Sequence, residues 1–404
     1  MIMNGVAALF PLIAIPVITR TVTPTDYGVY AIFLVGVNIL MPLVGLGFET
    51  AAGRRYVDRG DTNYAAYITT GLALTGCLAA FVYGALYSLA PQLAATIPVP
   101  GKWFWAWVAV AWAQTIIGLI LVLHQMGKRP TVFGKWYIGR AFFLNGLLVI
   151  FVLSGLAGWV NLITVLVVGH CSFAVAGIIW LWRKQLIVLS LSYQHLKHIV
   201  RYGAPLIPHM IGAALVTATD RVLLVNLIDE AAAGIYTIGY QVGLAMFLMS
   251  QSVNRAWTPW FYDRMKENSN QSRVRAVTAG YWVALIYIIA GMGFATVGWF
   301  VLPFIFGETY LEAMPVFIWI VAAFVAQGLW SLTASYLYYS EETLWVSVSS
   351  ALAAIFNIGL TYILIQTNGM IGAAQGTFIA YMLGFITVTI VTVRRAQLPW
   401  RLRS

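Results

Sequence analysis

The stretch TRTVTPTDYGVYAIFLVGVNI, from Thr19 to Ile39, decides the fold because it joins two long apolar segments through a short polar turn. Arg20 stands at this junction in a chain that has few charges. The composition is 61% hydrophobic and only 9% charged, whereas an ordinary soluble domain carries about 25% charged residues. The sequence therefore predicts an integral membrane protein.

Apolar stretches of this kind recur along the whole chain. Stretches of about 20 residues cross the hydrocarbon core as helices, because lipid offers no partner for an exposed backbone amide. The predicted spans are 3–19, 29–52, 64–90, 103–123, 138–155, 159–182, 205–227, 233–254, 281–302, 315–338, 344–366 and 372–393. We expect the first segment to stay as a helix, because no basic residue precedes its apolar run and no small-x-small site follows it. The predicted class is all-α and polytopic, with about twelve transmembrane helices.

The basic residues predict the orientation. One set of loops and helix ends holds Arg54, Arg55, Arg59, Lys128, Arg129, Lys135, Arg140, Arg183, Lys184, Lys197, Arg201, Arg255, Arg264, Lys266, Arg273, Arg275, Arg394, Arg395, Arg401 and Arg403. Only Arg20 and Lys102 flank the opposite loops, and Arg221 falls within a span. Because basic loops stay inside, we expect a cytoplasmic-membrane protein with both termini cytoplasmic. The formal charge of +10 then requires no nucleic-acid partner.

A short internal repeat divides the chain into halves. GVYAI at 28–32 recurs as GIYTI at 234–238, a shift of 206 residues in a chain of 404. Each copy follows an arginine-bearing segment and an acidic turn. Six spans in each half return the chain to the same side, so we expect two bundles related by a parallel repeat. The predicted division is a bundle at 1–182, a cytoplasmic amphipathic connector at 183–204, and a second bundle with a basic tail at 205–404.

Four motifs carry a resemblance to a known family. They are TRTVTPTDYGVYA at 19–31, RYGAPLIP at 201–208, TDRVLL at 219–224 and AAAGIYTIGYQV at 231–242. In these residues the chain resembles the O-antigen and polysaccharide flippases of the multidrug, oligosaccharidyl-lipid and polysaccharide exporter superfamily. The resemblance implies a carrier, not an enzyme, that turns an undecaprenyl-pyrophosphate-linked oligosaccharide to the outer leaflet by alternating access. It implies no cofactor, and as partners the lipid-linked oligosaccharide, membrane lipids and polysaccharide polymerase or assembly proteins.

Such a carrier needs cations for the pyrophosphate, and two arginines are the leading candidates. An arginine inside a bilayer is costly and usually faces a cavity. Arg221 lies about 9 Å inside the outer end of its predicted helix, at about 1.5 Å per residue. Arg20 is nearer a helix end, where snorkelling to the headgroups is the alternative. Asp220 precedes Arg221, and a salt bridge of either residue that holds the bundles together is the alternative to substrate binding.

A second group of charges marks the predicted cytoplasmic entrance. Glu49, Arg54, Arg55 and Arg140 lie at the inner ends of the first half, and Arg255 lies in the second half at the place that corresponds to Glu49. For Arg54 and Arg55 the alternative is topology alone. For Glu49 it is a structural carboxylate that pairs between helices.

His170 is the candidate for proton coupling. It lies midway along a predicted span, and its charge can change near neutral pH. The alternative is a neutral histidine that is hydrogen-bonded to another helix. His195 and His198 have no acidic or cysteine companions, so the sequence predicts no metal site.

Two other functions remain open. A drug or cation antiporter of the same superfamily would need an acidic cavity, whereas the helix-end charges here are mostly basic. A membrane polysaccharide polymerase or ligase commonly places charged catalytic groups in a large outer loop, which this sequence lacks. The sign of the charges favours an anionic cargo.

Overall fold

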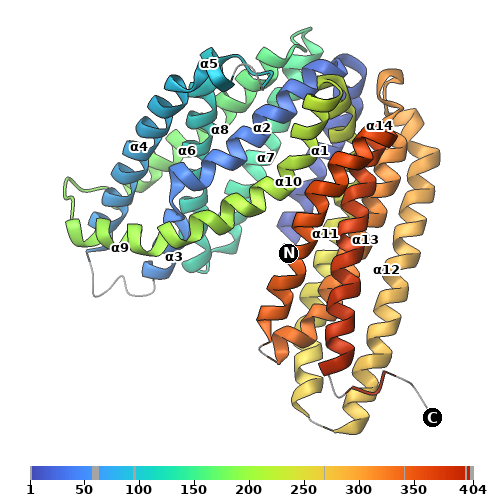
Figure 1. Cartoon of the computed structure of the whole chain (residues 1–404). Coiled ribbons are helices and arrows are strands. Elements are labelled where there is room, and N and C mark those ends of the chain that lie inside the picture. The colour runs from blue at the N-terminus through green and yellow to red at the C-terminus, as the bar shows by residue number, and fades with distance from the viewer. Residues whose placement is uncertain are drawn as a thin grey trace. The chain divides into compact units, whose positions relative to one another are not determined.

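The structure is a computed structural model that describes residues 2–56, 63–93, 97–267, 269–340, 342–395 and 398–400. Within these residues every regular element is a helix (Figure 1). The chain divides into two compact units, Met1–Ala218 and Thr219–Ser404, called unit 1 and unit 2 below. The predicted all-α class is confirmed.

The helices follow one another with short connections. Those that begin in unit 1 are α1 (Ile2–Thr21), α2 (Pro24–Gly45), α3 (Phe48–Arg55), α4 (Tyr64–Ser88), α5 (Ala90–Leu93), α6 (Phe104–Met126), α7 (Pro130–Leu153), α8 (Trp159–Arg183), α9 (Tyr193–Gly203) and α10 (Ile207–Leu227). The last of these crosses the boundary between the units. Unit 2 continues with α11 (Glu230–Lys266), α12 (Asn270–Ile305), α13 (Ala313–Tyr339) and α14 (Thr343–Arg395).

The membrane spans can be matched to these helices. Among the described residues, nine helices are long and apolar enough to cross a membrane. One of them, α14, consists of two helices joined at Gly369, where φ is 58° and ψ is −143°. Glycine adopts this conformation without a steric penalty. The two remaining predicted spans fall on α1 and α10, so the described helices account for all twelve.

The repeated motif lies at the start of a helix in each unit. Thr23 caps α2, where its hydroxyl accepts a hydrogen bond from the Asp26 amide at 3.1 Å. Asp229 caps α11 and accepts from the Ala232 amide at 2.7 Å. Such caps satisfy amides that have no partner within the helix. The GVYAI and GIYTI copies begin at the fifth residue of α2 and of α11, just after the first turn.

One predicted span is interrupted. The apolar run at 29–52 predicts a single helix, but α2 ends at Gly45 and α3 begins at Phe48. Leu46 and Gly47 between them have φ of 50° and 59°. A left-handed residue cannot continue a right-handed helix, so the charged residues of α3 belong to a separate short helix.

Each unit packs around one central helix. In unit 1, α6 contacts α2, α3, α4, α7 and α8, and in unit 2, α13 contacts α11, α12 and α14. Glycines allow the close approach. A Cβ at Gly243 of α11 would overlap Ile320 of α13, and a Cβ at Gly36 of α2 would overlap Trp107 of α6. Small residues are the usual means of bringing helices together in a membrane, where lipid is as apolar as the side chains.

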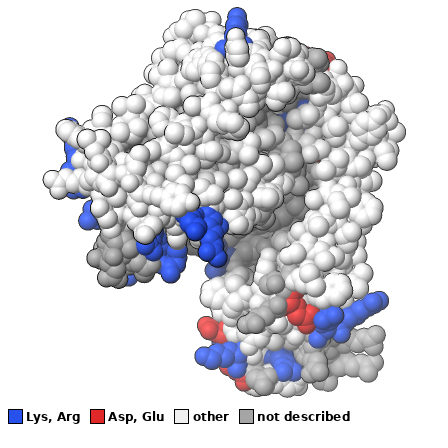
Figure 2. Space-filling view, turned by 60° about the vertical axis from the view of Figure 1, so that its left-hand side comes forward, with Lys and Arg blue, Asp and Glu red and all other residues white. Residues whose placement is uncertain are grey.

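Charges gather at one end of each unit, called its basic end below. Figure 2 shows clusters of Lys and Arg at these ends and few charges on the rest of the visible surface. In unit 2 the basic end carries Arg264, Lys266, Arg273, Arg275, Arg394 and Arg395, together with Asp263, Glu267 and Glu342. Two ion pairs lie there, Arg264 with Glu267 at 2.6 Å and Arg395 with Glu342 at 2.9 Å.

The turn inside α14 gives a stability prediction. A Cβ at Gly372 would overlap the carbonyl oxygen of Leu364 in the preceding helix, and backbone cannot move aside as a side chain can. We expect Gly372→Ala to cost about 1–3 kcal/mol of stability, as overpacking usually does. Gly359→Ala, in the helix of α14 that precedes Gly369, is the control, because its Cβ would meet open space. Thermal unfolding in detergent should show a lower midpoint for Gly372→Ala alone, and equal midpoints would refute the close contact.

Candidate functional site

Asp220 lies in the core of unit 2. Its side chain is only 4% exposed. One carboxylate oxygen, Oδ2, accepts a hydrogen bond from the Tyr236 hydroxyl at 2.5 Å and another from the Thr377 hydroxyl at 3.0 Å. Tyr236 belongs to α11 and Thr377 to α14. The carboxylate therefore joins α10 to two other helices within the same unit.

Arg221 follows Asp220 but contacts different groups. Its Nε donates to the Thr237 hydroxyl at 3.2 Å, and its guanidinium carbon lies 4.6 Å from the centre of the Tyr240 ring. This distance is within the range of a cation–π interaction. Arg221 lies six residues before the end of α10 at Leu227, about 9 Å inside the helix. The side chain is half-buried, so the guanidinium is held on α11 without being enclosed.

These contacts form a compact polar group, called the α10 polar cluster: Asp220, Arg221, Tyr236, Thr237, Tyr240 and Thr377. Its members come from α10, α11 and α14. The sequence indicates the two charged members but not the four hydroxyl-bearing ones. Tyr236 and Thr237 lie inside the repeated GIYTI motif, which was the signal available for them. Nothing in one sequence connects Thr377 to Asp220 across 157 positions.

Arg140 lies deeper in unit 1 than its predicted place at an inner helix end, and that prediction is wrong. It is the eleventh residue of α7, which begins at Pro130 and has 24 residues. Arg140 is therefore about 15 Å along a helix of about 36 Å, near its middle. Its Nε is buried and has no hydrogen-bond partner among the described residues. Proline at the first helical position starts α7 eight residues before the apolar run at 138.

His170 is buried in unit 1 with both ring nitrogens within reach of partners. Nδ1 lies 2.9 Å from the Leu166 carbonyl oxygen, to which it can only donate. Nε2 is then an acceptor and lies 3.5 Å from the Gln114 side-chain nitrogen on α6. This is the geometry of a neutral imidazole bonded to another helix. Proton coupling by His170 stays a prediction. The alternative, a neutral histidine that is hydrogen-bonded to another helix, fits these contacts better.

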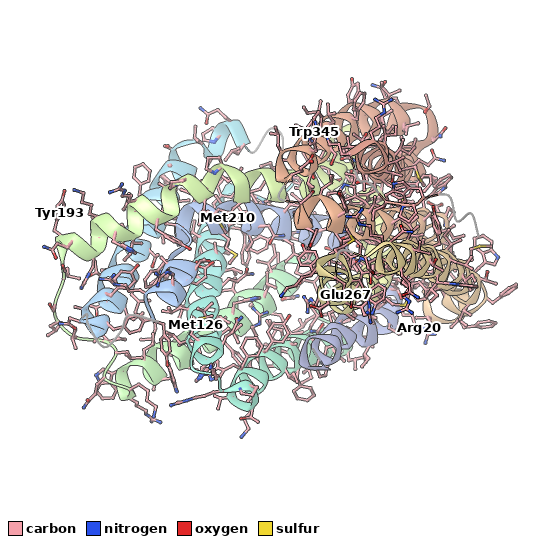
Figure 3. All side chains as sticks on the ribbon, turned by 90° about the horizontal axis from the view of Figure 1, so that it is seen from below. Arg20, Met126, Tyr193, Met210, Glu267 and Trp345 are labelled. Atoms are coloured by element: carbon pink, nitrogen blue, oxygen red, sulfur yellow. The ribbon has the colours of Figure 1, made fainter. Side chains whose placement is uncertain are left out.

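The other predicted residues are not members of the α10 polar cluster. Arg20 lies in the last turn of α1 and is exposed; its side chain is labelled in Figure 3. Glu49, Arg54 and Arg55 share the short helix α3, where Glu49 packs against α6 at Gly118. Arg255 is exposed on α11. Within unit 2 the structure brings together Asp220 and Arg221, and the binding roles of all these residues stay predictions.

The predicted connector at 183–204 contains the amphipathic helix α9 (Tyr193–Gly203), which lies within unit 1. It docks on α4 through His198, whose Nδ1 lies 3.0 Å from the Tyr67 hydroxyl, and through His195, whose ring meets the Tyr67 ring edge-on. Burial, and then the charge of Arg55, lower the pKa of both histidines below the usual value. Both are therefore neutral when α9 is docked near neutral pH. Tyr193, labelled in Figure 3, begins α9 and is exposed.

Comparison with solved structures identifies the architecture. The lipid II flippase MurJ in an inward closed conformation matches with a TM-score of 0.76 at 14% identity, over 97% of this chain and 87% of that one. An inward-facing multidrug resistance MATE family transporter of the MOP superfamily matches with a TM-score of 0.70 at 15% identity, over 96% and 94%. At these identities the similarity shows the fold alone, a two-lobed architecture of twelve helices.

Comparison of sequences identifies the family. Lsg locus putative protein 1 of Haemophilus influenzae is 21% identical over 374 residues, which cover 87% of this chain and 86% of that protein. A family model described as polysaccharide biosynthesis protein matches residues 17–315. This match covers most of the chain, including the α10 polar cluster except Thr377. The chain is therefore a multi-pass membrane protein that belongs to the polysaccharide biosynthesis protein family.

Proposed function

We propose that the protein is a flippase that moves a polyprenyl-pyrophosphate-linked oligosaccharide from the inner to the outer leaflet of the cytoplasmic membrane by alternating access. The observation that most supports this proposal is the arrangement of charge in the α10 polar cluster. The Asp220 carboxylate is closed inside the core, whereas the Arg221 side chain is only half-buried about 9 Å inside a span. The accessible deep charge is cationic, which suits a pyrophosphate. The family and the fold of the lipid II flippase support this reading.

The residues that we propose for the pyrophosphate are Arg221 first, then Arg20 and Arg255. Arg140 joins them because its guanidinium lies near mid-span and has an unsatisfied Nε. A planar guanidinium matches the oxygens of a phosphate in pairs. Glu49, Arg54 and Arg55 are proposed as entrance residues. Polysaccharide polymerase or assembly proteins would receive the delivered units.

Deletion of the gene tests this function in cells. Without the flippase, surface polysaccharide should be lost and lipid-linked oligosaccharide should accumulate on the cytoplasmic side, because synthesis continues while export stops. A plasmid copy of the wild-type gene is the control and should restore both. Unchanged surface polysaccharide and no accumulated lipid-linked unit in the deletion strain would refute the proposal.

A drug or cation antiporter is the second candidate, because a multidrug transporter has the same fold. That function requires an accessible carboxylate for the cation, and Asp220 is buried beneath two hydroxyl donors. Increased sensitivity of the deletion strain to cationic dyes, with normal polysaccharide, would favour the antiporter.

The direction of transport depends on the orientation, which we propose to be cytoplasmic for both termini. Single cysteines at positions 58 and 268, in a variant without Cys77 and Cys171, should resist a membrane-impermeant thiol reagent in intact cells. Both positions lie outside the described residues. A cysteine in place of Glu230, at the start of α11, should react. Labelling of position 58 from outside would reverse the orientation.

A further inference from the structure

Unit 2 contains an apolar cavity that the proposed function does not use. Its volume is about 220 Å³, and it lies among all four helices α11, α12, α13 and α14. Residues from each helix line it, among them Trp257, Gly280, Leu332 and Phe385. It is larger than an apolar cavity of about 150 Å³ that stays dry in water and binds benzene. Close packing of this bundle elsewhere makes such a space conspicuous.

The C-terminal segment closes the cavity on one side. Leu398 and Trp400 belong to its lining, although the chain has already left α14 at Arg395. The Tyr281 hydroxyl of α12 donates to the Trp400 carbonyl oxygen at 2.8 Å. Tyr281 is 46% exposed. Tyrosine with one apolar and one exposed side is typical of the headgroup level of a membrane, so Tyr281 places this closure at the membrane surface.

The remaining walls extend from this level towards the membrane interior. They comprise Leu329 to Tyr336 of α13 and Phe385 to Val393 of α14, which are the last turns of two spans. The Thr333 hydroxyl in the wall is already bonded to the Leu329 carbonyl oxygen. The Trp257 Nε1, Thr389 Oγ1 and Trp400 Nε1 atoms of the lining residues are buried and have no hydrogen-bond partner among the described residues. Most of the remaining lining is apolar, which suits a hydrocarbon chain. The lipid bilayer that surrounds the protein supplies hydrocarbon chains that could fill the cavity.

Positive charge lies beside the same cavity. Arg275 immediately precedes Ala276, and Arg394 immediately follows Val393; Ala276 and Val393 are both lining residues. These arginines belong to the basic end of unit 2. A lipid whose chain entered the cavity would therefore have its headgroup near cations. Charge complementarity favours an anionic headgroup.

We infer that this cavity binds one hydrocarbon chain of an anionic lipid, with the headgroup at the arginines of the basic end and Trp400 over the entrance. The site is separate from the α10 polar cluster and is not a transport site. Two lipids have this chemistry, an anionic glycerophospholipid and a polyprenyl phosphate. Gly280 leaves space in the cavity that a side chain could fill. A Cβ at this position would lie 3.7 Å or more from Trp257, which is an ordinary van der Waals distance.

Photolabelling of the purified full-length protein tests the inference. The probe is phosphatidylglycerol with a diazirine in one acyl chain, and labelled residues are mapped by mass spectrometry. Leu329 and Leu332 are each only 8% exposed, so the probe reaches them through the cavity. We expect both to be labelled in the wild type. Ile289 of α12, which is 59% exposed, reports general labelling by surrounding lipid.

Filling the cavity should remove the label from its walls alone. We expect Gly280→Leu to reduce labelling of Leu329 and Leu332 at least tenfold while labelling of Ile289 is unchanged. Gly293→Leu is the matched control, because Gly293 is on the same helix and faces open space, and its pattern should equal the wild type. Ala284→Met fills the same cavity if Gly280→Leu is not recovered as folded protein.

Competition distinguishes the two sources of the lipid. Stronger competition by unlabelled polyprenyl phosphate identifies the carrier lipid as the occupant, and stronger competition by phosphatidylglycerol identifies bulk phospholipid; either result upholds the site. A phosphatidylcholine probe should label Leu329 and Leu332 more weakly. Equal labelling by phosphatidylcholine, or undiminished labelling in folded Gly280→Leu, would overturn the inference. The labelling and the competition measurements do not depend on flipping activity.

Discussion

Arg221→Ala is expected to abolish surface polysaccharide while the protein remains in the membrane at its normal level. The change removes the accessible deep cation of unit 2. Loss of a hydrogen-bonded charged contact costs about 1.5–3 kcal/mol, which slows a step that depends on it by roughly 10- to 150-fold at 1.4 kcal/mol per factor of ten. Lipid-linked oligosaccharide should accumulate on the cytoplasmic side. Polysaccharide output and immunoblotting of membranes measure the two quantities.

Three variants separate a binding role from a structural one. Arg221→Lys keeps the charge and loses the planar fork, so it should restore activity only in part. Thr237→Val removes the hydrogen bond that holds the Arg221 Nε and should be much less harmful. Arg264→Ala is the matched control, since this exposed arginine pairs with Glu267 at the basic end, and should leave activity unchanged. Normal output from Arg221→Ala at normal protein level would eliminate the role.

The second large effect concerns the energy source. An anionic headgroup that moves outward across an inside-negative membrane gains about 2.3 kcal/mol per charge per 100 mV. Two uncompensated charges would gain roughly 5 kcal/mol, close to the 5.5 kcal/mol that converts a 1:99 distribution into 99:1. We therefore expect a potassium diffusion potential to drive flipping in proteoliposomes at equal pH on both sides. Dissipation of the potential with excess valinomycin and equal potassium should abolish the net movement.

Proton coupling through His170 is the competing explanation for the energy source. The hydrogen-bond geometry of His170 argues against this explanation. Its Nδ1 is used on Leu166 and its Nε2 faces Gln114, so the neutral form is satisfied where it lies. His170→Asn should remain active and should keep its response to the potential. Flipping that responds only to a pH gradient, and that is lost in His170→Asn, would make this histidine the coupling site.

The sequence predicts the spans well because length and apolarity are local properties. Every predicted span overlaps a described helix, although the span 29–52 is broken between α2 and α3. The α14 turn falls at Gly369, between the spans predicted at 344–366 and 372–393. Depth within a span is predicted less well. Arg140 was misplaced because hydropathy does not detect the start of α7 at Pro130. The break after Gly45 was missed because left-handed Leu46 carries no composition signal.

Contacts between residues that are far apart in the sequence are the second feature that the sequence does not predict. Asp220 meets Thr377, and Tyr281 meets Trp400, across 157 and 119 positions. The first pairing depends on how helices pack, and helices in lipid pack through shape and small residues more than through an apolar face that the sequence reveals. The second depends on the path of the chain after α14 ends at Arg395. The sequence therefore indicated Asp220 and Arg221 as a pair worth attention, but not that one is enclosed and the other accessible.

The central claim is that this chain moves a lipid-linked oligosaccharide across a bilayer. The most direct measurement is the flipping of a fluorescent polyprenyl-pyrophosphate oligosaccharide by the purified protein in proteoliposomes, read by a membrane-impermeant quencher added outside. The account predicts that with an inside-negative potential the quenched fraction rises above the outer-leaflet fraction seen in protein-free vesicles, and that Arg221→Ala vesicles stay at that lower level. A wild-type fraction equal to that of protein-free vesicles, with transport of a cationic dye in the same preparation, would contradict it.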